Sequence, residues 1–120
     1  MNRLKELSEA RIYIIGDEDT VVGFLLAGIG SKDGLGQTNY KIISPKVPKP
    51  ELEETFKQYL ERKDCGIIII NQHIAEQIRP LIDLHSGPVP AILEIPSKEQ
   101  PYDPNKDSIT QKIKTFFGET

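Results

Sequence analysis

Acidic and amide side chains follow two apolar runs, and they are the first candidates for chemistry in this sequence. The acidic segment 17–19 follows the run 12–15, and Asn71 ends a second run that begins at Gly66. If both runs are parallel strands, their carboxyl ends meet at the sheet edge where α/β folds bind ligands. Carboxylates there suit a magnesium ion and, with an aspartate nucleophile, phosphoryl transfer. Asn71 is not a carboxylate, so the acidic run is better interpreted as a helix cap.

Glycines near the first strand raise the question of a nucleotide site. Gly28 and Gly30 are separated by one residue, but no third glycine follows at the spacing of a dinucleotide-binding loop. The pair also ends a predicted helix, whereas a phosphate-binding loop must begin one. No G-x-x-x-x-G-K-[ST] sequence occurs. We therefore predict no nucleotide and no other cofactor.

The histidines and the cysteine show no catalytic or metal-binding pattern. His73 follows the second run, His85 ends a predicted helix, and neither is accompanied by a nucleophile elbow. A structural zinc site needs several clustered ligands, and Cys65 is the only cysteine. Cys65 precedes the apolar run and is interpreted as a small side chain that is buried or half-buried. We predict no catalytic residue, no metal site and no enzymatic activity.

Strands and helices alternate along the chain, which predicts an α/β fold with a parallel sheet. We expect a flavodoxin- or Rossmann-like sheet of four strands in the order 2-1-3-4, flanked by helices. Pro80 is expected to kink or divide the third helix. The expected elements, in chain order, are strand 12–15, helix 17–29, strand 40–44, a helix from about residue 50 to 60, strand 66–71, helix 72–85 and strand 89–95.

Two segments give the clearest predictions of burial. Four consecutive isoleucines, Ile67–Ile70, are typical of a central parallel strand covered on both faces. The helix 17–29 is apolar on nearly every side, so we expect it to be buried on both faces as well. In the following helix the apolar stripe is Leu52, Phe56, Tyr59 and Leu60.

The C-terminal part differs from the rest of the chain. We place an α/β domain at 1–96, and a proline-rich linker with a C-terminal helix at 97–120. The predicted helix 105–117 carries an apolar stripe at i, i+4, i+7 and i+8. The periodicity leaves open whether this helix packs on its own sheet or on another protein. The stripe, and our candidate partner-binding site, consists of Ile109, Ile113, Phe116 and Phe117.

Composition limits the possible partners. The chain has 120 residues, 15 Lys and Arg, and 18 Asp and Glu, for a net charge of −3. A sequence-independent nucleic-acid binder needs a concentrated positive face, so no nucleic acid is expected. The longest unbroken apolar run, Ile67–Ile70, is far too short to span a bilayer. We expect a cytoplasmic protein without direct membrane insertion.

Three long segments resemble the F subunit of eukaryotic V-type ATPases. They are GDEDTVVGFLLAGIG at 16–30, GIIIINQHIAEQIRP at 66–80 and PAILEIPSKEQPYDPNKDSI at 90–109, in that family's order and spacing. The resemblance implies a non-catalytic subunit of the central stalk, or rotor, which helps to couple ATP hydrolysis to proton transport.

The resemblance also implies partners and a location. The implied partners are the coiled-coil D subunit, the catalytic hexamer of A and B subunits, and the rotor of the membrane sector. The implied location is the cytosolic face of vacuolar and other endomembranes, reached through the complex. The alternative is an unrelated flavodoxin-like binding or signalling module whose tail helix packs in cis.

Overall fold

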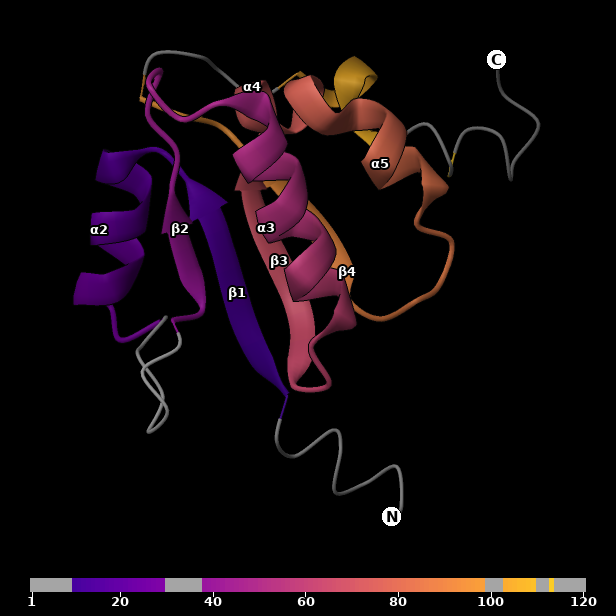
Figure 1. Cartoon of the computed structure of the whole chain (residues 1–120), viewed down its shortest axis with the longest axis horizontal. Coiled ribbons are helices and arrows are strands. Elements are labelled where there is room, and N and C mark those ends of the chain that lie inside the picture. The colour runs from indigo at the N-terminus through magenta and orange to yellow at the C-terminus, as the bar shows by residue number, and fades with distance from the viewer. Residues whose placement is uncertain (1–9, 30–37, 99–102, 110–112, 114–120) are drawn as a thin grey trace.

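The computed structural model describes residues 10–29, 38–98, 103–109 and 113. Four parallel strands form one sheet in the order β2-β1-β3-β4, which confirms the predicted fold class and strand order. Figure 1 shows the sheet with helices on both sides. The strands are β1 (Arg11–Gly16), β2 (Tyr40–Ile42), β3 (Cys65–Asn71) and β4 (Ala91–Ile95).

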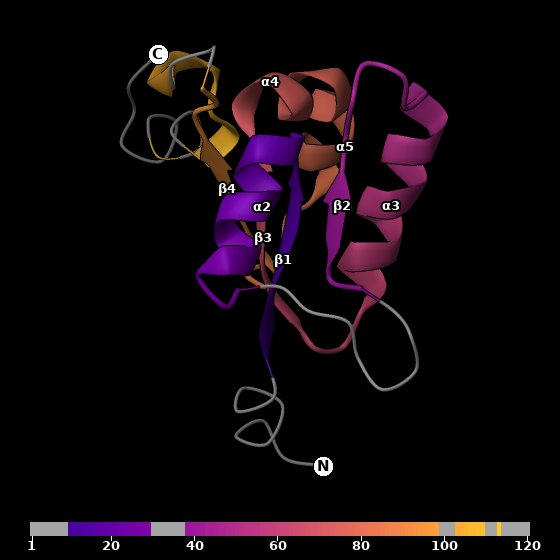
Figure 2. The same cartoon turned by 90° about the vertical axis from the view of Figure 1, so that its left-hand side faces the viewer.

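The helices are divided unequally between the two faces of the sheet. Figure 2, which views the sheet close to edge-on, shows α2 on one side and α3 on the other. The connection from β1 to β2 moves across the sheet in the direction opposite to the next two connections. Because all three crossovers are right-handed, α2 lies on the face opposite to the helices that follow it. The helical segments are α2 (Glu18–Leu26), α3 (Lys49–Glu61), α4 (Gln72–Ala75), the 3₁₀ turn η1 (Glu76–Ile78), α5 (Arg79–Leu84) and the 3₁₀ turn η2 (Pro104–Lys106).

Alternation along the strands sends neighbouring side chains to opposite faces. Ile68 lies opposite Tyr13 and Ile92 in the neighbouring strands, and all three belong to the main core. Among the described residues, this core on the α3 side contains fourteen buried side chains. Ile69 lies opposite Ile14 and Leu93, on the α2 side. The central position predicted for the isoleucine run is confirmed, although Ile67 is only half-buried.

The expected burial of helix 17–29 on both faces is wrong. In α2 only Val21 is buried, whereas Val22 is 42% exposed and Leu26 is 85% exposed. Helices α3, α4 and α5 belong to the other side of the sheet, so they do not cover the outer side of α2 (Figure 2). The apolar residues on the outer side of α2 are therefore not evidence that a second element of the chain packs there.

Local chemistry explains the remaining differences in boundaries. β4 begins at Ala91 rather than at 89, since Pro88 and Pro90 have no N–H to donate to a strand ladder. Pro80 divides the third helix as expected, because α4, η1 and α5 replace one continuous helix. Residue 105 lies in η2 rather than in the tail helix, and the helical residues described beyond it are 108, 109 and 113.

Candidate partner-binding surface

The carboxyl ends of three strands are held together by the amide of Asn71, which is fully buried. Its Oδ1 accepts a hydrogen bond from the backbone N of Asp17 at 2.8 Å. Its Nδ2 donates to Thr20 Oγ1 at 3.1 Å and to the carbonyl of Pro96 at 3.2 Å. An amide accepts and donates hydrogen bonds at the same time, whereas an ionised carboxylate only accepts them. Asn71 therefore fixes the ends of β1, β3 and β4.

The acidic run after β1 caps α2, as the sequence predicted. Asp17 Oδ1 accepts from the backbone N of Thr20 at 2.8 Å, which satisfies one free donor of the first helical turn. The close approach of the Asn71 amide requires a glycine at position 16. A Cβ at Gly16 would stand 2.7 Å from Asn71 Oδ1. At this edge of the sheet the Asn71 amide and the Asp17 carboxylate are thus engaged in structural hydrogen bonds.

His73 and His85 have different surroundings. His73 lines a hollow with the segment 17–19 and Lys98, and its buried Nδ1 has no hydrogen-bond partner within the described residues. His85 Nε2 lies 2.8 Å from the carbonyl of Pro90, to which it donates. Among the described residues no three His, Cys, Asp or Glu side chains are arranged to hold a metal ion.

Cys65 is buried, as predicted. Burial raises the pKa of its thiol to about 12, helped by the nearby charge of Asp64. The reactive form of cysteine is the thiolate. Near neutral pH this side chain therefore acts as part of the core and not as a nucleophile.

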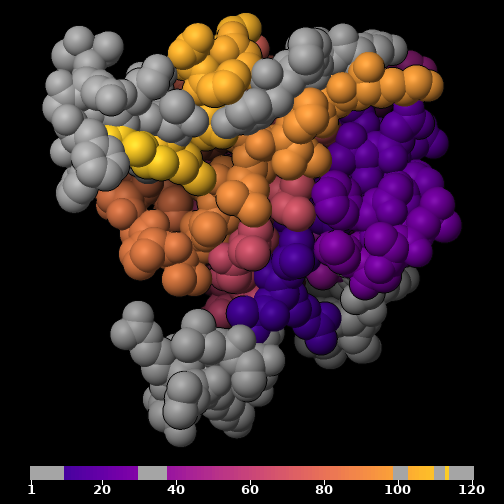
Figure 3. Space-filling view, turned by 180° about the vertical axis from the view of Figure 1, so that it is seen from behind, coloured from indigo at the N-terminus to yellow at the C-terminus, as the bar shows by residue number. Residues whose placement is uncertain are grey.

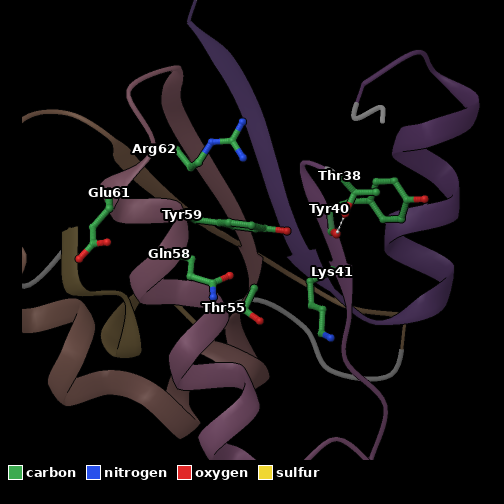
Figure 4. Close-up of a pocket in the computed structure, with 8 residues that line it drawn as sticks. All are labelled: Thr38, Tyr40, Lys41, Thr55, Gln58, Tyr59, Glu61 and Arg62. Atoms are coloured by element: carbon green, nitrogen blue, oxygen red, sulfur yellow. Dashed lines mark hydrogen bonds between the residues drawn. The ribbon is translucent and has the colours of Figure 1, made fainter. Parts of the chain in front are cut away.

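A second hollow of about 690 Å³ lies between β2 and α3 (Figure 4). Lys41 and Arg62 line it, but each has an anionic partner. Lys41 Nζ lies 2.7 Å from a carboxylate oxygen of Glu51, and Arg62 Nε lies 3.4 Å from one of Asp64. A phosphate site needs positive charge that is available to the ligand. The paired cations give this hollow no clear affinity for a nucleotide.

The predicted partner-binding residues are only partly within the described chain. Ile109 is 37% exposed and Ile113 is 52% exposed. Phe116 and Phe117 lie outside the described residues, so their placement is untested. Ile109 borders a shallow depression with Pro90, Ala91 and Ile92 at the β4 edge of the sheet. The tail stripe thus begins beside β4 with apolar surface left uncovered.

Sequence reasoning missed further exposed apolar residues. On the α2 side of the sheet Leu93 is 42% exposed, and Ile67, Ala91 and Ile95 are half-buried. Figure 3 shows atoms of β4, β3 and β1 at the surface of this face, between α2 and residues 103–109. Leu84, which borders a hollow with Phe56 and Leu60, is 78% exposed, and Val89 is 57% exposed. The exposure of Leu84 could have been found from the sequence, since it lies at the end of its helix.

The chain is similar to proteins of one named family over most of its length. Residues 12–113 match the family described as ATP synthase (F/14-kDa) subunit. The V-type proton ATPase F subunit of Xenopus laevis is 53% identical over 104 residues, which cover 87% of this chain and 94% of the relative. The human protein of that name is 50% identical over 106 residues (88% and 89%), and the Arabidopsis thaliana protein 49% over 111 residues (92% and 87%).

This chain belongs to the family of V-type proton ATPase F subunits. The resemblance found in the sequence is therefore confirmed, and the alternative of an unrelated flavodoxin-like module is wrong. The family match ends at residue 113, so it includes Ile109 and Ile113 but not Phe116 and Phe117. No helix within the described residues is both long enough and apolar enough to cross a membrane.

Proposed function

We propose that this chain is a non-catalytic subunit of the central stalk, or rotor, of a V-type ATPase. In this role it pairs with the coiled-coil D subunit and helps to couple ATP hydrolysis to proton transport. The observation that carries the proposal is family membership over residues 12–113. Its wider partners are the catalytic hexamer of A and B subunits and the rotor of the membrane sector. Through the complex it lies on the cytosolic face of vacuolar and other endomembranes.

The tail stripe is the proposed contact with the D subunit. Ile109 and Ile113 are exposed, although exposed isoleucine is unfavourable in water. Phe116 and Phe117 continue the same stripe by their spacing, and aromatic residues are frequent anchors in interfaces. Helix-on-helix packing with a coiled coil would remove this apolar surface from water.

The non-catalytic role is supported by the chemistry of the two hollows. Asn71 occupies the position that a phosphoryl-accepting aspartate would need, and its amide is committed to three structural hydrogen bonds. The cations beside β2 are paired with carboxylates. We expect titration calorimetry of the isolated chain with ATP to detect no binding. A defined stoichiometry at micromolar affinity would contradict the non-catalytic role.

The decisive test compares the affinity for the D subunit among variants that each replace exposed apolar residues with smaller or polar ones. Ile113→Ser and the pair Phe116→Ala/Phe117→Ala should each weaken binding to the D subunit by roughly tenfold or more, as expected for interface anchors. Leu26→Ser is the matched control, because Leu26 is more exposed than Ile113 but lies on α2, away from the tail. Its affinity should equal that of the unchanged chain.

Two outcomes would overturn the proposed contact. Wild-type affinity in both tail variants, together with a lower melting temperature, would mean that the tail packs on its own sheet. A loss of binding in Leu26→Ser without loss in the tail variants would place the partner on the α2 side. Both measurements use the full chain, so a folding defect is visible in the same samples.

A further inference from the structure

A row of polar side chains on α4, η1 and α5 holds the segment 103–108 against the domain. The row consists of Gln72, Glu76, Arg79 and Asp83, at positions i, i+4, i+7 and i+11. This spacing keeps the four residues on one side of the helical layer even though η1 and Pro80 interrupt it. We call the segment 103–108 the strap.

Successive residues of the row contact successive residues of the strap. Gln72 donates to the carbonyl of Asp103 and accepts from its backbone N, both at 2.6 Å. Further along, Lys106 Nζ lies 3.2 Å from Glu76 Oε1. A pair of opposed hydrogen bonds to one backbone residue fixes its position in the way that a neighbouring strand would. The strap is therefore aligned with the helical layer.

Ser108 is the most strongly held residue of the strap and is buried. Its Oγ donates to Asp83 Oδ1 at 2.7 Å and accepts from Arg79 Nη1 at 2.9 Å. Its backbone N donates to Glu94 Oε2 at 3.3 Å. Arg79 in turn binds both carboxylate oxygens of Glu94, at 2.6 and 2.9 Å. Helix α5, strand β4 and the strap therefore meet at one polar cluster.

The polar character of this cluster points to positioning more than to stability. Only 1% of the Glu94 side chain is exposed, so its ion pair with Arg79 has lost most of its hydration. Apolar side chains of the same volume would often be as stable or more stable than such a pair. Hydrogen bonds, unlike apolar contacts, act only at defined distances and angles. The cluster thus sets where Ser108 stands relative to β4.

The helical tail begins immediately after this fixed point. Asp107 is buried, and its Oδ1 accepts from the backbone N of Ile109 at 2.9 Å, in the manner of an N-cap residue. Ile109 is the first residue of the tail stripe and is exposed. The start of the tail helix is therefore attached to the domain through the strap and not through the proline-rich segment.

We propose that Gln72, Arg79, Asp83 and Glu94 are positioning residues that make the strap part of the rigid α/β domain and so fix the point at which the tail helix starts. This inference concerns the free chain, although its use in assembly rests on the proposed function. On this proposal the strap belongs to the domain, whose end was expected at residue 96.

Backbone dynamics of the full chain in solution test whether the strap belongs to the rigid domain. NMR order parameters of residues 103–108 should be close to the value of about 0.85 found in rigid backbone. Order parameters below about 0.6 across 103–108 would show that the polar row does not hold the strap and would overturn the proposal.

Substitution at Ser108 supplies a second readout. Ser108→Asp places a further carboxylate beside Asp83 and Glu94, so it should release the strap and lower the order parameters of 103–108. Lys106→Ala is the control, since it removes only the exposed ion pair with Glu76. Unchanged amide chemical shifts in β1 and β3 show that the domain is still folded. A strap that stays rigid in Ser108→Asp contradicts the positioning role.

Binding to the D subunit separates this inference from the proposed function. Ser108→Asp should weaken binding by roughly tenfold, because the freed strap must be ordered again in the complex. Lys106→Ala should change binding by less than about twofold, as expected for an exposed pair. If the chain does not bind the D subunit at all, the proposed function fails, while the NMR result still decides whether the polar row holds the strap. Wild-type affinity in Ser108→Asp, despite a released strap, would refute the positioning role.

Discussion

One face of the sheet packs against α3, α4, η1 and α5, whereas among the described residues the other packs against α2. The first face contributes to a core of fourteen buried residues. On the second face the buried apolar side chains are Ile14, Ile69 and Val21. Both faces carry isoleucine-rich strand surface, so the difference comes from which connections cross them.

The comparison shows that an apolar side chain stays exposed where its helix has no second neighbour to pack against. α3 is mostly polar, and three residues of its apolar stripe are nevertheless buried, with Leu52 at 1%, Phe56 at 0% and Tyr59 at 7% exposure, while Leu60 is half-buried. α2 is far more apolar, and Leu26 is 85% exposed. Apolar residues on the outer side of a helix are buried only if another element or another protein covers them.

The largest expected effect is on the face covered by several helices. Phe56→Ala removes a fully buried ring between α3 and the sheet and should lower the free energy of unfolding by about 3–5 kcal/mol. Urea unfolding followed by circular dichroism measures the change. A loss below about 1 kcal/mol would mean that α3 is not part of the main core.

Two neighbouring residues of β3 compare the faces directly. Ile68 points to the α3 side and is fully buried, whereas Ile69 points to the α2 side and is 8% exposed. Each alanine variant should lose about 2–5 kcal/mol, with Ile68→Ala at least about 1 kcal/mol worse because more atoms surround its cavity. An equal or larger loss for Ile69→Ala would indicate that the α2 side is packed as closely as the other.

Alkaline pH should destabilise the α3 side, where Cys65 and Tyr59 are buried. Burial raises the pKa of Cys65 from 9.0 to about 12 and that of Tyr59 from 10.0 to about 12. The folded state therefore holds both protons more tightly than the unfolded state. The stability from these groups is complete below about pH 9 and is lost as the pH rises toward 12.

Unfolding by urea over this pH range checks the alkaline effect. Tyr59→Phe has no ionisable group at that position, so its stability should fall less steeply above pH 10, the ordinary pKa of tyrosine. Tyr40→Phe is the matched control, since Tyr40 is only half-buried. Identical pH profiles for Tyr59→Phe and the unchanged chain would contradict the assignment.

The smallest effect is expected on the outer side of α2. Val22→Ser and Leu26→Ser should each change the free energy of unfolding of the isolated chain by less than about 0.5 kcal/mol, because both side chains are exposed. Urea unfolding measures this as well. A loss above about 1.5 kcal/mol in either variant would show that this helix is covered in solution.

Much of the fold was predictable because it depends on local patterns. The stripe of α3, the isoleucine run of β3 and the division at Pro80 follow from periodicity and from proline's missing N–H. The strap was not predictable in this way. Gln72 and Arg79 look like ordinary exposed helix residues in the sequence, and their partners Asp103 and Ser108 lie 31 and 29 residues further along the chain.

The candidate partner-binding surface was also predictable only in its local pattern. The spacing of Ile109 and Ile113 identified an apolar stripe, and both residues are exposed. The spacing could not show whether the domain itself covers this stripe, because a helix that packs on its own domain and a helix that packs on another protein have the same period. Its first turn begins at Asp107 and Ser108, which are held by hydrogen bonds that the spacing of the stripe does not indicate.

The sequence by itself determined the elements, the parallel sheet and the family, since all three depend on residue order and on short-range spacing. Only the tertiary structure decided which apolar surfaces stay exposed and where the tail is attached. The handedness of the connections puts α2 on the face opposite to α3, and Ser108 is fixed by Asp83, Arg79 and Glu94. Exposure and attachment depend on contacts between distant residues, and periodicity within one element carries no information about them.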